Sequence, residues 1–162
     1  MTANEVEQIA MALAAAYEQG QGRLVTDVSR GWGLHGREVG DWLRRRHPDV
    51  RRQTCDLFSR HADGSLARLI EVKGRGGRTS VSLVDRQYSA MVTCREDWWL
   101  YVALECRTDR PKLVVVREPA RLPWHRLPGA AGTLHGSPRV RDEGHWHVGQ
   151  DDILRLGSVV TG

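Results

Sequence analysis

The sequence predicts a single mixed α/β domain, and three patterns support that class. An amphipathic helical repeat opens the chain, two alternating runs flank an Asp-Gly dipeptide, and two apolar runs follow in the second half. With 162 residues, the chain has the length of one ordinary domain and can bury a core without disulfides or metal. We therefore expect a mixed β-sheet that contains an antiparallel hairpin and is flanked by helices.

The first elements are a helix, a strand and a second helix. Apolar residues recur at helical spacing over residues 4–19, with Asn4 as the expected N-cap. Residues 23–28 predict a short strand. After a Gly-rich loop, residues 37–46 predict a brief basic helix that ends before Pro48.

The next two strands form the expected hairpin. They cover residues 52–60 and 65–73, and the segment between them ends in Asp63-Gly64. Asp-Gly between alternating runs is the strongest short-range hairpin signal, and it predicts a two-residue turn.

A third helix and two buried strands complete the predicted core. Residues 84–95 have helical spacing, with Asp85 as the expected N-cap. Residues 98–104 and 113–116 are apolar enough to be strands that are buried on both faces.

The predicted domain covers residues 1–122. Within it, residues 29–53 form a basic insertion before the hairpin. Residues 123–162 are rich in proline, glycine and histidine, and only residues 151–156 suggest a further helical turn. We expect this extension to pack on the same domain.

A two-residue turn fixes which side chains meet across the hairpin. It places Ala62 opposite Ser65, and by the same register Asp56 opposite Glu71. Because side chains alternate along a strand, Lys73 lies on the same face as Glu71. The other, apolar face then takes four side chains: Cys55, Leu57, Ile70 and Val72.

Asp56, Glu71 and Lys73 together predict a metal site. Two carboxylates that lie opposite each other destabilise a sheet unless a positive charge lies between them. Oxygen ligands favour a hard ion, Mg²⁺ or Mn²⁺, which polarises a phosphoryl oxygen while the lysine orients a water. The alternative is a solvated polar face with an ordinary cross-strand ion pair.

The hairpin also resembles a known family. Asp56 followed by Glu71-Val72-Lys73 resembles the PD-(D/E)xK pattern of the restriction-endonuclease-like superfamily. More narrowly, the segments 54–57 and 70–74 resemble the NO VEIN C-terminal domain family, and the similarity runs to about residue 122. This resemblance implies a restriction-endonuclease-like core, Mg²⁺-dependent endonuclease activity on DNA, and a role in bacterial defence beside a helicase or another defence-system subunit.

The resemblance adds further site residues. It implies an acidic residue of the first helix beside the metal, for which Glu7 matches best, with Glu5 and Glu18 as alternatives. It also implies a polar role for Gln87 at the start of the third helix. The Val72 carbonyl is a further candidate ligand for the metal.

The positive charge of the chain favours nucleic acid as a partner. Of 24 Lys and Arg residues only Lys73 and Lys112 are lysines, and the formal net charge is +4. The planar guanidinium group suits phosphate, although arginine also occurs on any solvated face. The candidate phosphate contacts are Arg44, Arg45, Arg46, Arg75, Arg78 and Arg86.

The cysteines, the N-terminal segment and the histidines further limit the kinds of protein that the sequence predicts. Three cysteines without Cys-x-x-Cys spacing predict neither disulfides nor a zinc knuckle, which fits a reducing cytoplasm. We expect no signal peptide and no membrane span. His145 and His147 could share a zinc ion with His125 and His135, but the spacing favours surface histidines.

Two functions therefore remain open. The first is a metal-dependent nuclease, which as a homodimer could cut both strands of a duplex. The second is a non-catalytic module of a larger defence complex that retains the fold and binds nucleic acid or protein.

Overall fold

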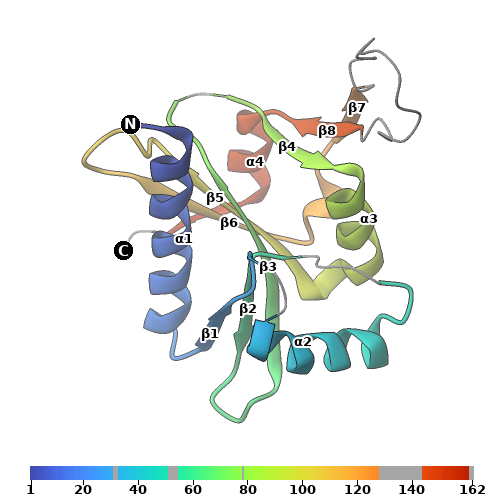
Figure 1. Cartoon of the computed structure of the whole chain (residues 1–162). Coiled ribbons are helices and arrows are strands. Elements are labelled where there is room, and N and C mark those ends of the chain that lie inside the picture. The colour runs from blue at the N-terminus through green and yellow to red at the C-terminus, as the bar shows by residue number, and fades with distance from the viewer. Residues whose placement is uncertain (31–32, 51–54, 78, 128–143, 161–162) are drawn as a thin grey trace, which may run out of the picture.

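A six-stranded mixed sheet forms the centre of the fold (Figure 1). This computed structural model describes the whole chain apart from residues 31–32, 51–54, 78, 128–143 and 161–162, and the side chains of residues 33–38. Each neighbouring pair of strands is antiparallel except β3 and β5, which are parallel. In spatial order the strands are β1 (Leu24–Asp27), β2 (Leu57–Arg60), β3 (Leu66–Gly74), β5 (Trp98–Leu104), β6 (Lys112–Arg117) and β9 (Ser158–Val160).

A second, smaller antiparallel sheet and several helices pack around the first. In this sheet, the strand order is β4 (Val81–Val84), β8 (His145–Val148) and β7 (His125–Leu127). The helices of the described chain are α1 (Ala3–Gly20), α2 (Gly33–Arg46), α3 (Asp85–Cys94) and α4 (Gln150–Leu156), with short 3₁₀ turns η1 (Arg95–Asp97) and η2 (Pro119–Arg121). The predicted mixed α/β class is thereby confirmed.

Two apolar cores lie on opposite faces of the large sheet. On one face, Ala10 and Ala14 of α1 pack against Ile70 and Val72 of β3. On the other face, Leu69 belongs to a core that also includes residues of α2, α3, α4 and the small sheet. This division follows from the alternation of side chains along β3.

Cys55 lies on the face opposite to the predicted one. The sequence placed it with Leu57, which indeed packs toward α1, but Cys55 belongs to the other core. The prediction assumed that residues 52–60 form one continuous strand, whereas β2 begins at Leu57 and strict alternation does not apply before it.

The N-cap of helix α1 lies two residues before the predicted one. The N-cap is Thr2, not Asn4. Thr2 Oγ1 accepts a hydrogen bond from the Glu5 backbone N–H at 3.3 Å, and Glu5 Oε2 accepts one from the Thr2 backbone N–H at 2.6 Å. This reciprocal capping box satisfies two helix-terminal donors, which Asn4 could not do from inside the first turn. The third helix is corrected likewise: Asp85 is its first residue, and Val84 is the N-cap.

The hairpin between β2 and β3 has the predicted register, but its turn differs from the prediction. His61 N–H donates to Ser65 O at 2.8 Å, so the loop has three residues, and its last residue, Gly64, has a φ of +85°. That turn alone would shift the register by one residue. The partners of β2 then step from Leu66 to Arg68, and this bulge restores the pairing of Leu57 with Ile70.

The sequence did not predict several of the short strands. Residues 98–104 form β5 as expected, whereas β4, β7, β8 and β9 were not anticipated. These four strands have only three or four residues each, and their partners lie far away in the sequence. Residues 123–162 contribute three of them, so this extension supplies an edge strand of the large sheet and most of the small one. Among the described residues, no helix is both long and apolar enough to cross a membrane.

Gly74 allows α1 to lie close against β3. A Cβ atom at this position would lie 2.7 Å from the backbone O of Val6 and 2.9 Å from its Cγ1. We expect Gly74→Ala to lower the free energy of unfolding by about 1–3 kcal/mol, because backbone atoms must move to relieve the clash. Urea denaturation would measure the change. Gly77→Ala is the matched control, since nothing lies within 4 Å of its Cβ; equal losses in both variants would contradict this account.

Candidate active site

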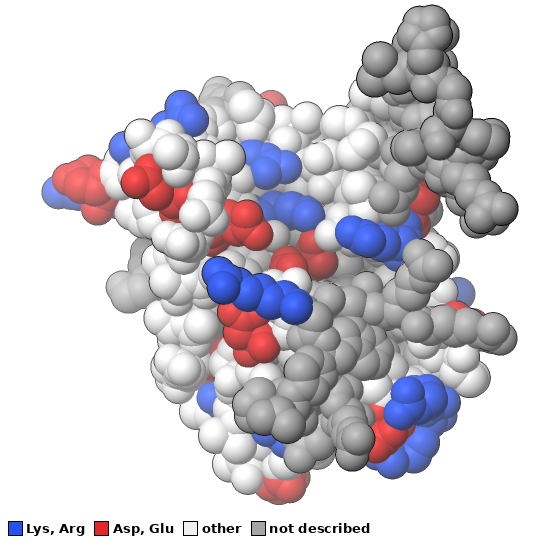
Figure 2. Space-filling model, in the orientation of Figure 1, with Lys and Arg blue, Asp and Glu red and all other residues white. Residues whose placement is uncertain are grey.

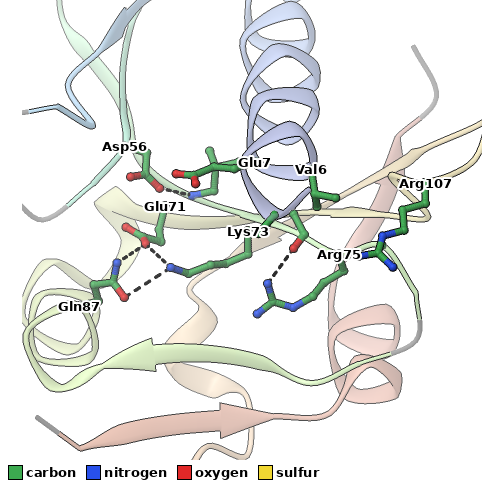
Figure 3. A pocket seen from close by; sticks show the side chains of 12 residues that line it. Val6, Glu7, Asp56, Glu71, Lys73, Arg75, Gln87 and Arg107 are labelled. Atoms are coloured by element: carbon green, nitrogen blue, oxygen red, sulfur yellow. Dashed lines mark hydrogen bonds and ion pairs between the residues drawn. The ribbon is translucent and has the colours of Figure 1, made fainter. Parts of the chain in front are cut away.

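A pocket of about 460 Å³ opens where the end of β3 meets the starts of α1 and α3 (Figure 3). Several charged side chains of both signs line it: Glu7, Asp56, Glu71, Lys73, Arg75 and Arg107. Gln87 of α3 and Val72 of β3 also line the pocket. The structure thus brings together the three residues predicted from the hairpin.

Asp56 is held at the end of β2 by backbone hydrogen bonds. Its N–H donates to Ile70 O at 2.8 Å, and its carboxylate Oδ2 accepts from Val72 N–H at 2.8 Å. The Asp56 carboxylate therefore accepts the hydrogen bond from Val72 N–H that a backbone carbonyl of a neighbouring strand would otherwise accept. This arrangement keeps the Asp56 carboxylate beside the Glu-Val-Lys segment.

Glu71, Lys73 and Gln87 form a connected polar group. Lys73 Nζ lies 2.7 Å from Glu71 Oε1 and 3.5 Å from Gln87 Oε1. Gln87 Nε2 also donates to Glu71 Oε1, while its Oε1 accepts from Val84 N–H at 3.1 Å. Gln87 consequently fixes the positions of both charged side chains.

Burial makes the two carboxylates resist ionisation. Glu71 is only 2% exposed, and its pKa is raised to about 7, mainly by burial and also by Asp56, against a partial offset from Lys73. Burial also raises the pKa of Asp56, and Glu7 and Asp27 add to that effect, while the Val72 N–H and Lys73 oppose it. The pocket therefore holds two carboxylates whose ionised form is disfavoured, beside the cationic side chains of Lys73, Arg75 and Arg107.

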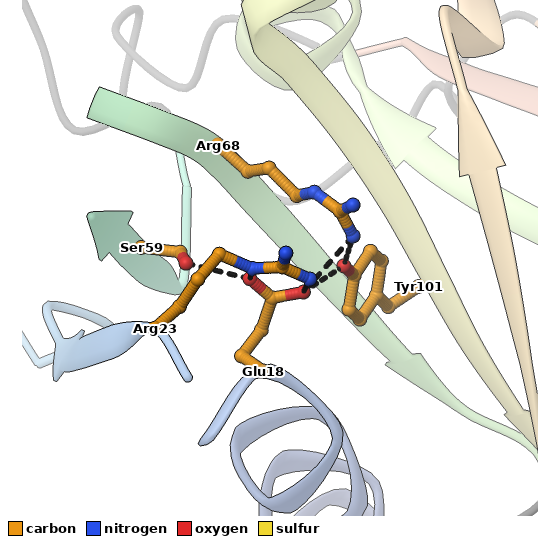
Figure 4. A network of polar contacts seen from close by, with 5 residues as sticks. All are labelled: Glu18, Arg23, Ser59, Arg68 and Tyr101. Carbon is orange, nitrogen blue, oxygen red and sulfur yellow. Dashed lines mark hydrogen bonds and ion pairs between the residues drawn. The ribbon is translucent and has the colours of Figure 1, made fainter. Parts of the chain in front are cut away.

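The structure separates the three glutamates proposed on the first helix. Glu7 lines the pocket and acts electrostatically on Asp56. Glu5 caps the helix, as described above. Glu18 is fully buried near the other end of α1, where it contacts Arg23 and Arg68 (Figure 4). Glu7 is thus the one of the three that lies at the pocket.

The arginines predicted to contact phosphate lie at different distances from the pocket. Arg75 lines the pocket and donates to Ser80 O at 2.9 Å and Gly74 O at 2.7 Å. Arg86 is exposed on α3 and lowers the pKa of Glu71. Arg78 lies outside the described residues.

The arginines of α2 lie elsewhere in the fold. Arg44 forms an ion pair with Asp41, and Arg46 pairs with Asp97 at 2.5 Å, so neither guanidinium is free of an anionic partner. Arg45 is exposed. On the face drawn in Figure 2, acidic and basic side chains lie next to one another across the described surface.

Sequence reasoning missed two charged residues near this site. Asp27, at the end of β1, raises the pKa of Asp56. Arg107 lines the pocket from the loop after β5, and a Cβ at Gly76 would meet its side chain at 2.7 Å. Neither residue stands in a local motif, because the pairing of β1 with β2 and the packing of two loops bring them here.

The small sheet braces the start of α3. Asp85 accepts hydrogen bonds from Trp146 Nε1 at 2.8 Å, from Arg126 Nη2 at 2.8 Å and from Gly144 N–H at 3.0 Å. Asp85 lies two residues before Gln87, so these contacts help to fix the part of α3 that reaches Glu71.

The residues at the pocket suit a hard cation in their chemistry but form a sparse ligand set. Among the described residues, no three His, Cys, Asp or Glu side chains lie together so as to hold a metal ion. Half-buried Asp56 and buried Glu71 nevertheless offer carboxylate oxygen atoms, and Mg²⁺ often uses only one or two carboxylates and several waters. The ring centroids of His125 and His147 lie 6.2 Å apart, but these two residues belong to no such group among the described residues, and His135 lies outside them.

The fold and the pocket define a mixed α/β protein with a buried glutamate, a half-buried aspartate and a lysine in one pocket at the end of strand β3 of its central sheet. The family model of the C-terminal domain of protein NO VEIN matches residues 6–116, which is more than half of the chain. The chain therefore belongs to the NO VEIN C-terminal domain family. No curated protein and no solved structure matches it.

Proposed function

We propose that this protein is a metal-dependent nuclease that hydrolyses phosphodiester bonds of DNA, on a restriction-endonuclease-like core. The observation that supports it is the convergence of Asp56, Glu71 and Lys73 in one pocket, with Glu71 and Lys73 in contact at 2.7 Å. Buried carboxylates with raised pKa values beside a lysine are typical of catalytic sites, although structural ion pairs can share that feature.

Asp56, Glu71 and the Val72 carbonyl would hold Mg²⁺ or Mn²⁺. The raised pKa values of the two carboxylates reflect burial first and then repulsion from neighbouring carboxylates, which are Asp56 for Glu71, and Glu7 and Asp27 for Asp56; a bound cation would offset both effects. When bound, the ion supplies Lewis-acid polarisation of a phosphoryl oxygen.

The remaining groups position the substrate and the attacking water. Lys73 donates hydrogen bonds to the water and stabilises negative charge that develops on the phosphate. Gln87 holds Lys73 and Glu71 in place, and Glu7 accepts a proton at the open side of the pocket. Arg75 and Arg86 lie beside these groups and would bind neighbouring phosphates.

The setting of this activity follows from the family resemblance. We place the protein in the cytoplasm, in bacterial defence, beside a helicase or another subunit of such a system. A homodimer would supply two sites for the two strands of a duplex.

Metal binding and cleavage test this proposal together. Mg²⁺ at about 100 times its Kd should stabilise the wild-type protein by about 2.7 kcal/mol, because it binds only the folded state. The double variant Asp56→Asn/Glu71→Gln should lose this stabilisation and should not cut plasmid DNA in Mg²⁺ or Mn²⁺. Thermal unfolding and gel electrophoresis, with EDTA as the metal-free reference, measure the two effects. Equal stabilisation of both proteins by Mg²⁺ would contradict the assigned ligands.

A non-catalytic binding module is the second candidate. The contact between Lys73 and Glu71 supports it, because the lysine already balances one carboxylate, as in a structural ion pair. Wild-type protein that retards DNA or a partner in a binding assay, yet never cuts DNA in either metal, would favour this function.

A further inference from the structure

A second pocket, of about 440 Å³, lies near the C-terminal end of α1 and shares no lining residue with the first. Trp99 of β5 is paired with Ile70 and packs on the core beneath α1, whereas Glu71 points to the opposite face. The side chains that matter for binding are Tyr17, Arg68, Trp99, Arg117, Arg121 and Ser158. The pocket is therefore separate from the candidate active site.

Two guanidinium groups gather on one indole ring in this pocket. The Arg68 Cζ lies 3.8 Å from the centroid of Trp99, and the Arg117 Cζ lies 5.9 Å from it. The buried Glu18 also holds Arg68 in place, because Glu18 Oε1 accepts a hydrogen bond from Arg68 Nη1 at 3.0 Å (Figure 4). The Arg68 guanidinium is thus fixed at the wall of the pocket before any ligand arrives.

The charges around this pocket leave an excess of positive charge. The carboxylate of Glu18 is shared between Arg68 and Arg23. Glu118 lies 4.0 Å from Arg117 and 3.9 Å from Arg121, which is the far limit of an ion pair. Four arginines and two glutamates give a net charge of +2 among the described residues in these contacts.

A phosphate monoester has the matching charge and geometry. It carries about −1.5 to −2 near pH 7, and the planar fork of arginine binds its oxygens in pairs. The pocket also has an apolar and aromatic part, formed by Tyr17, Trp99 and Val115. Its volume lies within the roughly 300–1,000 Å³ typical of sites for small ligands.

We propose that this pocket binds a nucleoside monophosphate, with the phosphate held by Arg68, Arg117 and Arg121 and the nucleoside against the aromatic side chains. The same chemistry could come from a free nucleotide or from the 5′-phosphorylated end of a strand. The proposal does not depend on hydrolysis at the first pocket.

Calorimetric titration tests the proposal, with AMP, adenosine and inorganic phosphate as probes. The buffer contains EDTA and low salt, so that a metal at the other pocket does not contribute. AMP should bind at least about tenfold more tightly than adenosine or phosphate, because only AMP uses both parts of the pocket. A 5′-phosphorylated trinucleotide that binds more tightly than AMP would identify a strand end as the source, and one that binds more weakly would identify a free nucleotide.

Two double variants decide where binding occurs. Arg117→Gln/Arg121→Gln should weaken AMP binding by at least about tenfold, because two charged hydrogen-bond donors are lost. Arg110→Gln/Arg155→Gln removes the same charge from exposed residues outside the pocket and should change the affinity by less than about twofold. Absent AMP binding, equal affinities for AMP and phosphate, or undiminished binding in the pocket variant would overturn the proposal.

Discussion

Replacing Lys73 by alanine should lower metal-dependent DNA cleavage by about 100- to 1,000-fold, because the reaction loses a charge that faces the developing negative charge of the phosphate. The expected loss lies mainly in kcat, since in the proposed mechanism Lys73 acts on the water rather than binding the duplex. Cleavage of plasmid DNA over time, at saturating Mg²⁺, measures it. The fold should persist, because Glu71 can take up a proton when its partner is removed.

The chain offers an unusually close control for this experiment. Lys112 is its only other lysine, and it is 54% exposed and paired with Glu105 at 3.2 Å on the far strand β6. Lys112→Ala should cut DNA at the wild-type rate. If the Lys73→Ala and Lys112→Ala variants cleave DNA equally well, Lys73 takes no part in the reaction. That result would contradict the proposed nuclease mechanism.

Replacing Glu18 by glutamine should lower the free energy of unfolding by about 3–5 kcal/mol, because it leaves the guanidinium groups of Arg23 and Arg68 without their buried counter-charge. Glu18 is fully buried, and Arg23 Nε lies 2.5 Å from its Oε2. Ser59 Oγ donates to the same oxygen at 2.6 Å, and Tyr101 donates to the other. The glutamine amide can accept at one oxygen only.

Urea denaturation of Glu18→Gln against Glu105→Gln measures this loss. Glu105 is 48% exposed and forms a surface ion pair, so its substitution should cost at most about 1 kcal/mol. Similar losses in the two variants would show that the network around Glu18 adds little stability.

The lowered pKa of Glu18 predicts how the free energy of unfolding changes at acidic pH. Burial opposes ionisation of Glu18, but hydrogen bonds from Arg23, Ser59 and Tyr101 outweigh it and lower its pKa below the ordinary 4.5. The stability that Glu18 contributes is therefore present above that pH and is lost as the pH falls through its lower, folded-state pKa. Glu18→Gln should show a weaker loss of stability over this acidic range than the wild-type protein, and parallel curves would contradict the assignment.

In the hairpin, the sequence predicted the pairing of the strands correctly but not the turn that joins them. The pairing that places Asp56 beside Glu71 was predicted from a two-residue turn, but the loop has three residues and a bulge skips Ala67. The two deviations cancel, so a correct register followed from an incorrect turn. Alternation of side chains supports this register independently, because a one-residue slip would move Leu57 away from the face that it shares with Ile70 and Val72.

Other parts of the site depend on contacts that leave no local pattern. The helix spacing predicted α1, yet only the packing of α1 on β3, close at Gly74, shows that Glu7 rather than Glu18 meets the pocket. Arg107 reaches the pocket through the loop after β5. The strands β4 and β8 are four residues long and find each other across some sixty residues, so neither could be recognised alone.

The contacts of Asp85 join the family-matched part of the chain to the segment that follows it. The family match ends at residue 116, whereas Gly144 and Trp146, which hold Asp85, lie beyond it. Gln87 thus belongs to the matched domain while its support comes from the segment that follows. The geometry of the candidate site therefore depends in part on a segment that the family model does not cover, so truncation after residue 116 would remove contacts that hold the start of α3.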